Sequence, residues 1–298
     1  MMEKELIYST PAFHRVFSSA LFDFFSFLLL TALLCAGAYP VYFSSPAYLE
    51  PTSSRKEIQL DSRLYEEKDG GVATLPSLLK NDEELSFNQK SEKVSSALLY
   101  CYTVYLKDEF EGKGRERLLS FFPEFKEGDS PLFSEEGERL LMDPYYDEAY
   151  FASYSEILET KAVGDLSKKS GYLRARRTIL IGYAATFLIA FSLAFGILFC
   201  LVPFLLHRGK KTLGMRLTRL AYVDARGLSP DASRFVLRFL FSYFLIGVAS
   251  LFSFGLPFCL SGAFAVFRKD RQNLSDYVCG TYLVDAEKTL IPEKAEEA

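Results

Sequence analysis

The residue whose chemistry stands out most in this sequence is Asp23, which is flanked by phenylalanines. A carboxylate inside an apolar membrane helix costs on the order of 3 kcal/mol unless it meets water or a partner. Arg15, Ser19 and Asp23 are spaced by four residues, so they share one ridge of a helix, and Ser26 follows on the same side. Such a carboxylate with a cationic partner can exchange protons or bind a small cation, and it can equally join helices as an ion pair.

A second motif, Gly209–Gly214, begins like a phosphate-binding loop. The Walker pattern then requires Lys and Ser or Thr after the second glycine, where this chain has Met215 and Arg216. Nucleotide binding is therefore not expected. No spacing among the five cysteines and two histidines is typical of a zinc site. No nucleophile motif or cofactor fingerprint accompanies them, so we expect neither an enzyme nor a cofactor.

Three long uncharged blocks must position these residues. They run over 24–49, 178–206 and 239–267, and each exceeds the roughly 20 residues that span a ~30 Å hydrocarbon core. The first block is too long for the apolar region of a cleavable signal peptide, so it is interpreted as a retained signal anchor. The sequence thus predicts a multi-pass membrane protein.

Basic residues near the ends of the blocks predict the orientation. They are concentrated in the loop 207–238 and in the tail after Phe267, which we place in the cytoplasm together with the N-terminus. Lys168, Lys169 and three arginines before the second block oppose this orientation. Because loop and tail share one side, the third block must enter and return. Gly255 and Pro257 offer the breaking point, and the last arm is short or re-entrant.

The segment between the first two blocks reads as a soluble domain. From Ser44 to Tyr172 it holds 16 Lys and Arg against 26 Asp and Glu, a net charge of −10, which leaves 18 against 12, or +6, elsewhere. We expect a strand or hairpin over Ile58–Leu64 before Asp69-Gly70-Gly71, then amphipathic helices over 91–110 and 145–162. The aromatic and acidic run 143–148 is a candidate recognition element.

The expected fold is therefore an all-α membrane helical bundle of three apolar blocks and four membrane segments, with a mainly helical α+β extracytoplasmic insert. The expected domains are 1–43 with the first membrane helix, 44–172 as the insert, 173–290 as the remaining membrane portion and 291–298 as a polar tail. Leu217, Leu220 and Val223 are expected to pack at the membrane interface.

Three groups of residues in the membrane portion form a recognisable set. They are Arg15 and Asp23, a loop motif, and Asn273–Asp276 before Gly280 and Thr281. The loop motif comprises Lys211, Thr212, Gly214, Asp224 and Gly227. Together these residues resemble the RDD family of bacterial membrane proteins, which is named for an arginine and two aspartates. The resemblance implies that Arg15, Asp23 and Asp276 are the name-giving residues. The arginine lies eight residues before the aspartate, where seven is more usual, and Ser275 stands where histidine is common.

The resemblance also implies a multi-pass protein of the bacterial plasma membrane, and two functions remain open. The first is a small transporter or transporter subunit that handles protons or cations through Arg15, Asp23 and Asp276, assembled as a homo-oligomer or with another membrane protein. Gly182, Ala190, Ala194 and Gly196 would provide close-packing sites for such an assembly. The second is a membrane-anchored interaction module whose acidic external domain binds a partner without transport. Anionic lipid head groups are expected at the basic loop, and nucleic acid is not expected as a partner.

Overall fold

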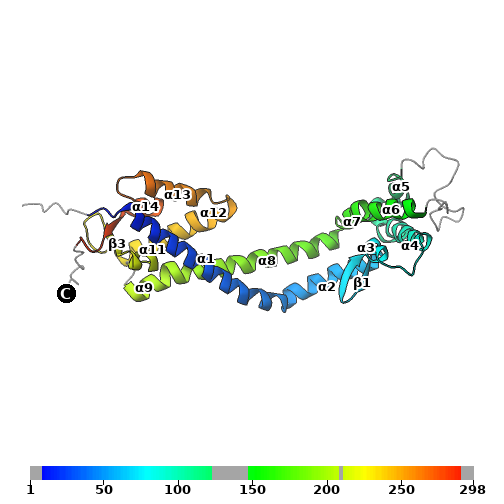
Figure 1. Ribbon diagram of the computed structural model, residues 1–298, viewed down its shortest axis with the longest axis horizontal. Coiled ribbons are helices and arrows are strands. Elements are labelled where there is room, and N and C mark those ends of the chain that lie inside the picture. The colour runs from blue at the N-terminus through cyan, green and yellow to red at the C-terminus, as the bar shows by residue number, and fades with distance from the viewer. Residues whose placement is uncertain (1–8, 123–146, 208–210, 290–298) are drawn as a thin grey trace, which may run out of the picture. The chain divides into compact units, whose positions relative to one another are not determined.

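The computed structural model describes residues 9–122, 147–207 and 211–289, and it is predominantly helical (Figure 1). The chain divides into two compact units. One comprises Met1–Pro40 with Ala185–Ala298, and the other comprises Val41–Ala184. The first contains most of the apolar helices, and the second contains the insert.

Among the residues that the structure describes, three helices are long and apolar enough to cross a membrane, and each overlaps one of the uncharged blocks: Phe13–Phe43, Ser170–Leu205 and Ala232–Phe252. The first is α1. Each of the others is one continuous helix with a π-helical segment in it. The second consists of α8 (Ser170–Gly196), η6 (Ile197–Leu201) and α9 (Val202–His207). The third consists of α11 (Ala232–Phe241), η7 (Ser242–Val248) and α12 (Ala249–Phe252). Their large apolar side chains, such as Leu29 and Leu33, are largely exposed, as expected for helices that face lipid.

The third apolar block breaks where the sequence predicts. Gly255 adopts φ +83°, a left-handed conformation that glycine tolerates, and Pro257 stands in the first turn of the next helix, α13 (Leu256–Phe267). Helix α13 packs back against η7 and α12, which makes a helical hairpin. Its 12 residues correspond to about 18 Å, less than the hydrocarbon core.

A two-stranded sheet in the membrane portion corrects the expectation of an all-α bundle. Strand β3 (Leu220–Asp224) pairs antiparallel with β4 (Thr281–Asp285), with Leu220 opposite Asp285 and Asp224 opposite Thr281. Leu220 and Val223 belong to β3 and are buried in two separate apolar clusters, whereas Leu217 is exposed. Their packing at a membrane interface stays a prediction. Two short helices flank the strands: α10 (Leu213–Leu217) and α14 (Leu274–Cys279).

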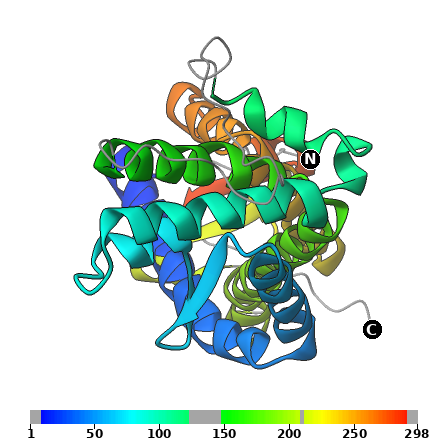
Figure 2. The same ribbon diagram turned by 90° about the vertical axis from the view of Figure 1, so that its right-hand side faces the viewer.

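In its described residues, 44–122 and 147–172, the insert is a small helical domain with one β-hairpin. Its elements are α2 (Pro46–Asp61), β1 (Tyr65–Lys68), β2 (Gly71–Thr74), α3 (Leu75–Lys80), α4 (Phe87–Tyr100), η1 (Cys101–Tyr105), η2 (Asp108–Phe110), α5 (Gly114–Leu119), α6 (Asp147–Ile157), η5 (Leu158–Ala162) and α7 (Val163–Leu166). Helices α4 and α6 lie side by side and enclose the core (Figure 2). Val94 and Leu98 of α4 and Tyr102 of η1, which lie within the amphipathic helix expected over 91–110, are fully buried.

Two details of the insert differ from the sequence-based expectation. The hairpin is present with Asp69 and Gly70 at its turn, but Ile58 and Leu60 belong to helix α2 rather than to a strand. The run in which they alternate with polar residues is too short to distinguish the two-residue period of a strand from the 3.6-residue period of a helix. Most of the run 143–148 and the whole tail 291–298 lie outside the described residues.

Candidate functional site

Asp23 lies at the N-terminus of helix α10, where backbone N–H groups lack partners within the helix. Thr212 caps this helix, because its hydroxyl accepts a hydrogen bond from the N–H of Met215 at 3.2 Å. Asp23 adds a carboxylate from another helix. Its Oδ2 accepts from the Thr212 hydroxyl at 2.5 Å, and its Oδ1 accepts from the N–H of Gly214 at 2.8 Å. A negative charge at a helix N-terminus is stabilising.

Arg15 lies at the opposite end of the same short helix. Its Nε and Nη2 donate to the carbonyl of Thr218 at 2.9 and 2.6 Å, and Nη2 also donates to the carbonyl of Arg219 at 3.2 Å. Its Nη1 forms an ion pair with Asp285 at 2.6 Å. Cationic groups stabilise the carbonyl end of a helix. Arg15 and Asp23 therefore bind the two ends of α10 with the charges that its dipole favours.

The ridge between these residues touches the backbone of α10 directly. A Cβ atom at Gly214 would lie 2.2 Å from the carbonyl oxygen of Ser19 and 3.0 Å from Cγ of Asp23. Only glycine permits this approach. The eight residues from Arg15 to Asp23 rise about 12 Å, which matches a five-residue helix with its two caps.

Asp276 belongs to a separate ion pair. Its Oδ1 accepts from Nε of Arg238 at 2.5 Å and from the hydroxyl of Thr281 at 3.2 Å. It also completes the capping box of α14: its backbone N–H donates to Oδ1 of Asn273 at 2.8 Å, and its Oδ2 accepts from the backbone N–H of Asn273 at 3.4 Å. Its carboxylate is almost fully buried, at 3% exposure. Asp276 thus holds α14 to α11 and to the start of β4.

The guanidinium of Arg238 joins this pair to the sheet. Its Nη2 donates to the hydroxyl of Tyr222, and its Cζ lies 3.8 Å from the centre of the Tyr222 ring. Burial raises the pKa of Tyr222, Arg238 lowers it, and the negative charges of Asp276 and Asp23 raise it again. The pKa of Tyr222 is raised overall, and both carboxylates contribute to this shift, although each has hydrogen-bond partners of its own.

The remaining loop residues build turns. Oδ1 of Asp224 accepts from the N–H groups of Arg226 and Leu228, each at 2.9 Å, and Gly227 completes the turn with φ +78°. Arg234 approaches Oδ2 of Asp224 at 3.7 Å. Gly280, at φ +60°, ends helix α14 immediately before Thr281 starts β4. Lys211 is half-buried and precedes the Thr212 cap.

The structure thus separates the three residues that the resemblance grouped. Arg15 pairs with Asp285, Asp23 caps α10, and Asp276 pairs with Arg238. Sequence reasoning missed Asp285 and Tyr222, and it assigned no partner to Arg238, whose side chain is 15% exposed. An arginine directly before an aromatic-rich apolar run was the available signal. Among the described residues, no group of three or more His, Cys, Asp or Glu is arranged to hold a metal ion.

Residues 162–280 match the model of the RDD family. The match includes the loop motif and Asp276 but not Arg15 or Asp23, which the insert separates from it along the chain. No curated protein and no solved structure matches the chain.

Proposed function

We propose, from the match of residues 162–280 to the RDD family model, that the chain is a membrane-anchored interaction module whose acidic insert binds a partner. The observation that carries the proposal is that Asp23, Arg15 and Asp276 of the membrane portion are used for internal bonds, while the insert has a hydrophobic core of its own. The proposal includes no catalytic step and no cofactor.

The hydrogen bonds of Asp23 support an anchoring role for the membrane portion. Each of its carboxylate oxygens accepts from a donor of the loop, Thr212 or Gly214. Groups satisfied in this way stabilise a fixed arrangement, because removing a partner leaves a costly unpaired group. Asp276 and Asp285 likewise have arginine partners at 2.5 and 2.6 Å. These bonds fix the loop and the last strand to the membrane helices.

The insert has the properties of a stable binding domain. Its core includes Leu64, Leu98 and Leu158, each with no exposed surface. A buried carboxylate, Asp165, accepts hydrogen bonds from the Tyr102 hydroxyl at 3.0 Å and from Arg117 Nε at 3.3 Å. A domain with such a core and a specific polar network retains its shape without a disulfide. Such a shape is required for recognition.

Two of the basic residues that oppose the expected orientation have structural roles in the insert. Lys168 donates to Oδ1 of Asp165 at 3.0 Å, and Lys169 donates to the carbonyl of Tyr105 at 3.2 Å while lying over its ring. Because these lysines are explained by bonds inside the insert, we retain the proposed topology. Both termini are cytoplasmic, the insert is extracytoplasmic, and the chain lies in a bacterial plasma membrane. On the cytoplasmic side, exposed Arg216 and Lys269 would meet anionic head groups.

A second candidate function, proton or cation handling, has one observation in its favour. Asp23 is a carboxylate within a helix that could cross the membrane, and such residues often mark ion pathways. Transport by so small a bundle requires assembly with another copy or another membrane protein. Ala190 and Ala194 are buried within the chain, and a Cβ at Gly182 would overlap Tyr42, so these small residues already serve internal packing. We therefore favour the interaction module.

Site-specific photo-crosslinking tests the proposed function. A photoreactive amino acid replaces Val104 or Phe87, which are exposed on the insert, or Ile189, which is exposed on a membrane helix, in cells that naturally express the full chain. We expect a discrete protein adduct at an insert position and lipid adducts at Ile189. Absence of a discrete protein adduct at both insert positions would contradict the proposal.

Flux measurements test the second candidate. The purified chain is reconstituted into vesicles, and proton and monovalent cation fluxes are compared with those of empty vesicles. We expect no difference. Flux above that of empty vesicles that disappears in Asp23→Asn would replace the interaction proposal with transport.

A further inference from the structure

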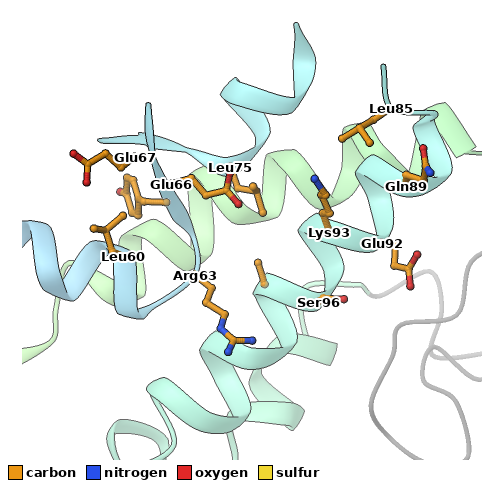
Figure 3. A pocket seen from close by; sticks show the side chains of 12 residues that line it. Leu60, Arg63, Glu66, Glu67, Leu75, Leu85, Gln89, Glu92, Lys93 and Ser96 are labelled. Carbon is orange, nitrogen blue, oxygen red and sulfur yellow. The ribbon is translucent and has the colours of Figure 1, made fainter. Parts of the chain in front are cut away.

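A groove on the insert lies between strand β1 and helix α4 (Figure 3). Its volume is about 710 Å³, which lies within the range of ligand pockets. Glu66 and Glu67 come from the strand, whereas Gln89, Lys93 and Ser96 lie along the helix. These five side chains are exposed, so the walls of the groove are polar and accessible.

The floor of the groove is apolar. Leu75 and Ala97 are buried in the core of the insert, and Leu60 and Leu85 are half-buried beside them. Arg63 stands at one end, with its guanidinium 3.9 Å from the centre of the Tyr100 ring. A ligand in this groove would therefore meet aliphatic surface below and charged groups at both sides.

A second hollow continues from the first. It has a volume of about 610 Å³ and shares Glu66, Glu67 and Lys93 with the groove. The two hollows adjoin each other at these three residues, and we call them together the trough. Two adjoining hollows can take successive parts of an extended chain.

The trough is acidic. Its charged lining consists of six acidic residues, Glu66, Glu67, Asp82, Glu83, Glu84 and Glu92, and three basic residues, Arg63, Lys68 and Lys93. The difference of three negative charges has the same sign as the net charge of the whole insert. Complementary charge steers association and disfavours partners of the same sign.

We infer that the trough binds an extended cationic segment of a partner protein, in which basic side chains alternate with apolar ones. In an extended segment successive side chains point to opposite sides, so the apolar ones can reach Leu75 and Leu85 while the basic ones approach Glu66. The neighbouring Glu67 pairs with Lys56 at 2.7 Å, a bond that a basic side chain of the partner would replace. This inference rests on the proposed function, because it names the class of partner that the insert recognises.

The test measures peptide binding by the full chain in nanodiscs of phosphatidylcholine. The probe is a fluorescein-labelled ten-residue peptide in which lysine alternates with valine. The comparison peptides replace lysine by glutamate, or valine by serine, and empty nanodiscs report binding to lipid. We expect saturable binding of the lysine–valine peptide, weaker binding of the lysine–serine peptide, and none of the glutamate peptide.

Two matched variants locate the binding site. Glu66→Gln/Glu67→Gln/Glu92→Gln removes three exposed carboxylates from the trough, and Glu109→Gln/Glu111→Gln/Glu116→Gln removes three exposed carboxylates elsewhere on the insert. We expect the trough variant to weaken binding at least about tenfold and the control variant less than about twofold. Ser96→Arg, which adds a positive charge to the trough, should also weaken binding. Circular dichroism and thermal unfolding are measured for each variant to test that it is folded.

Three results would overturn the inference. Equal loss in both triple variants would show a general electrostatic attraction, no binding to the full chain would exclude this ligand class, and binding to empty nanodiscs would assign the affinity to lipid. If crosslinking at Val104 still gives a protein adduct while the peptide does not bind, the inference fails and the proposed function stands. If neither the protein adduct nor peptide binding is observed, the inference and the proposed function are both contradicted.

Discussion

Asp23 accepts a hydrogen bond from the backbone N–H of Gly214 at 2.8 Å, and this bond joins the first membrane helix to a loop 191 residues later in the chain. The same glycine lies too close to Ser19 for any side chain. A hydrogen bond to a carboxylate and a close backbone contact thus hold helix α10 against helix α1 at the same residue.

Gly214→Ala should destabilise the membrane portion. The added Cβ would lie 2.2 Å from the Ser19 carbonyl oxygen, so α10 must shift away from α1, at a cost of about 1–3 kcal/mol typical of overpacking. Thermal unfolding in detergent measures this as a lower midpoint. Gly262→Ala is the matched control, because no atom lies within 4 Å of the position that its Cβ would take, and its midpoint should not fall. Equal midpoints for both variants would refute the close contact.

Asp23→Ala should free the N-terminus of α10. The change removes the acceptors of Gly214 and Thr212, and loss of a cap costs typically about 1 kcal/mol. Hydrogen exchange at the amides of Gly214 and Met215 should become faster. Asp23→Asn keeps one carbonyl acceptor and should give an intermediate rate. An unchanged exchange rate in Asp23→Ala would contradict the capping role.

Arg238→Met should lower the stability of the membrane portion, measured by thermal unfolding in detergent, more than Gly214→Ala or Asp23→Ala does. It leaves the buried carboxylate of Asp276 without its charged partner, and breaking a buried pair costs about 3–5 kcal/mol. The double variant Arg238→Met/Asp276→Asn should recover part of the loss, because no unpaired charge remains. Arg216→Met changes an exposed arginine and serves as the control. Additive losses in the double variant would show that the two side chains are not coupled.

The stability that Asp165 gives to the insert should depend on pH. Burial by itself raises the pKa of this carboxyl, but hydrogen bonds from Lys168, Arg117 and Tyr102 outweigh it and lower the pKa below the ordinary value. Its contribution is therefore complete above the unfolded pKa of about 3.9 and is lost as the pH falls through the folded pKa.

Urea unfolding followed by near-ultraviolet circular dichroism of the tyrosines tests this pH dependence. Asp165→Asn should be less stable than the unchanged chain at pH 7, and the difference should shrink as the pH falls below about 4. Glu109→Gln, an exposed position, should show no such convergence. A difference that stays constant between about pH 7 and about pH 3 would exclude the titration of Asp165 as its source.

The sequence predicts well those features that depend on long or local patterns. Uncharged blocks longer than a bilayer require no tertiary information, and a glycine and a proline within the third block suffice to predict its break at Gly255. In the insert, the stripe through Val94 and Tyr102 repeats often enough to identify a buried helix face.

Features that depend on distant pairing could not be predicted in this way. Strand β3 has five residues, and its partner β4 begins 57 positions after it ends, so no local pattern indicates the pair. Without the sheet, Asp285 had no reason to be placed beside Arg15, and Arg238 could not be assigned to Asp276. The helical spacing of Arg15 and Asp23 indicated a shared ridge, but the helix that this ridge holds became evident only in the structure.

The pairing of Arg15 with Asp285 also affects the order in which the protein can be assembled. The arginine leaves the ribosome early, and its partner follows 270 residues later. During synthesis, which proceeds from the N-terminus at about 5–20 residues per second, the first helix must stay in the membrane for some tens of seconds without this bond. A ribosome that stops before β4 releases a chain in which the guanidinium of Arg15 lacks its carboxylate. Quality-control proteases could use that difference to distinguish a truncated chain from a finished one.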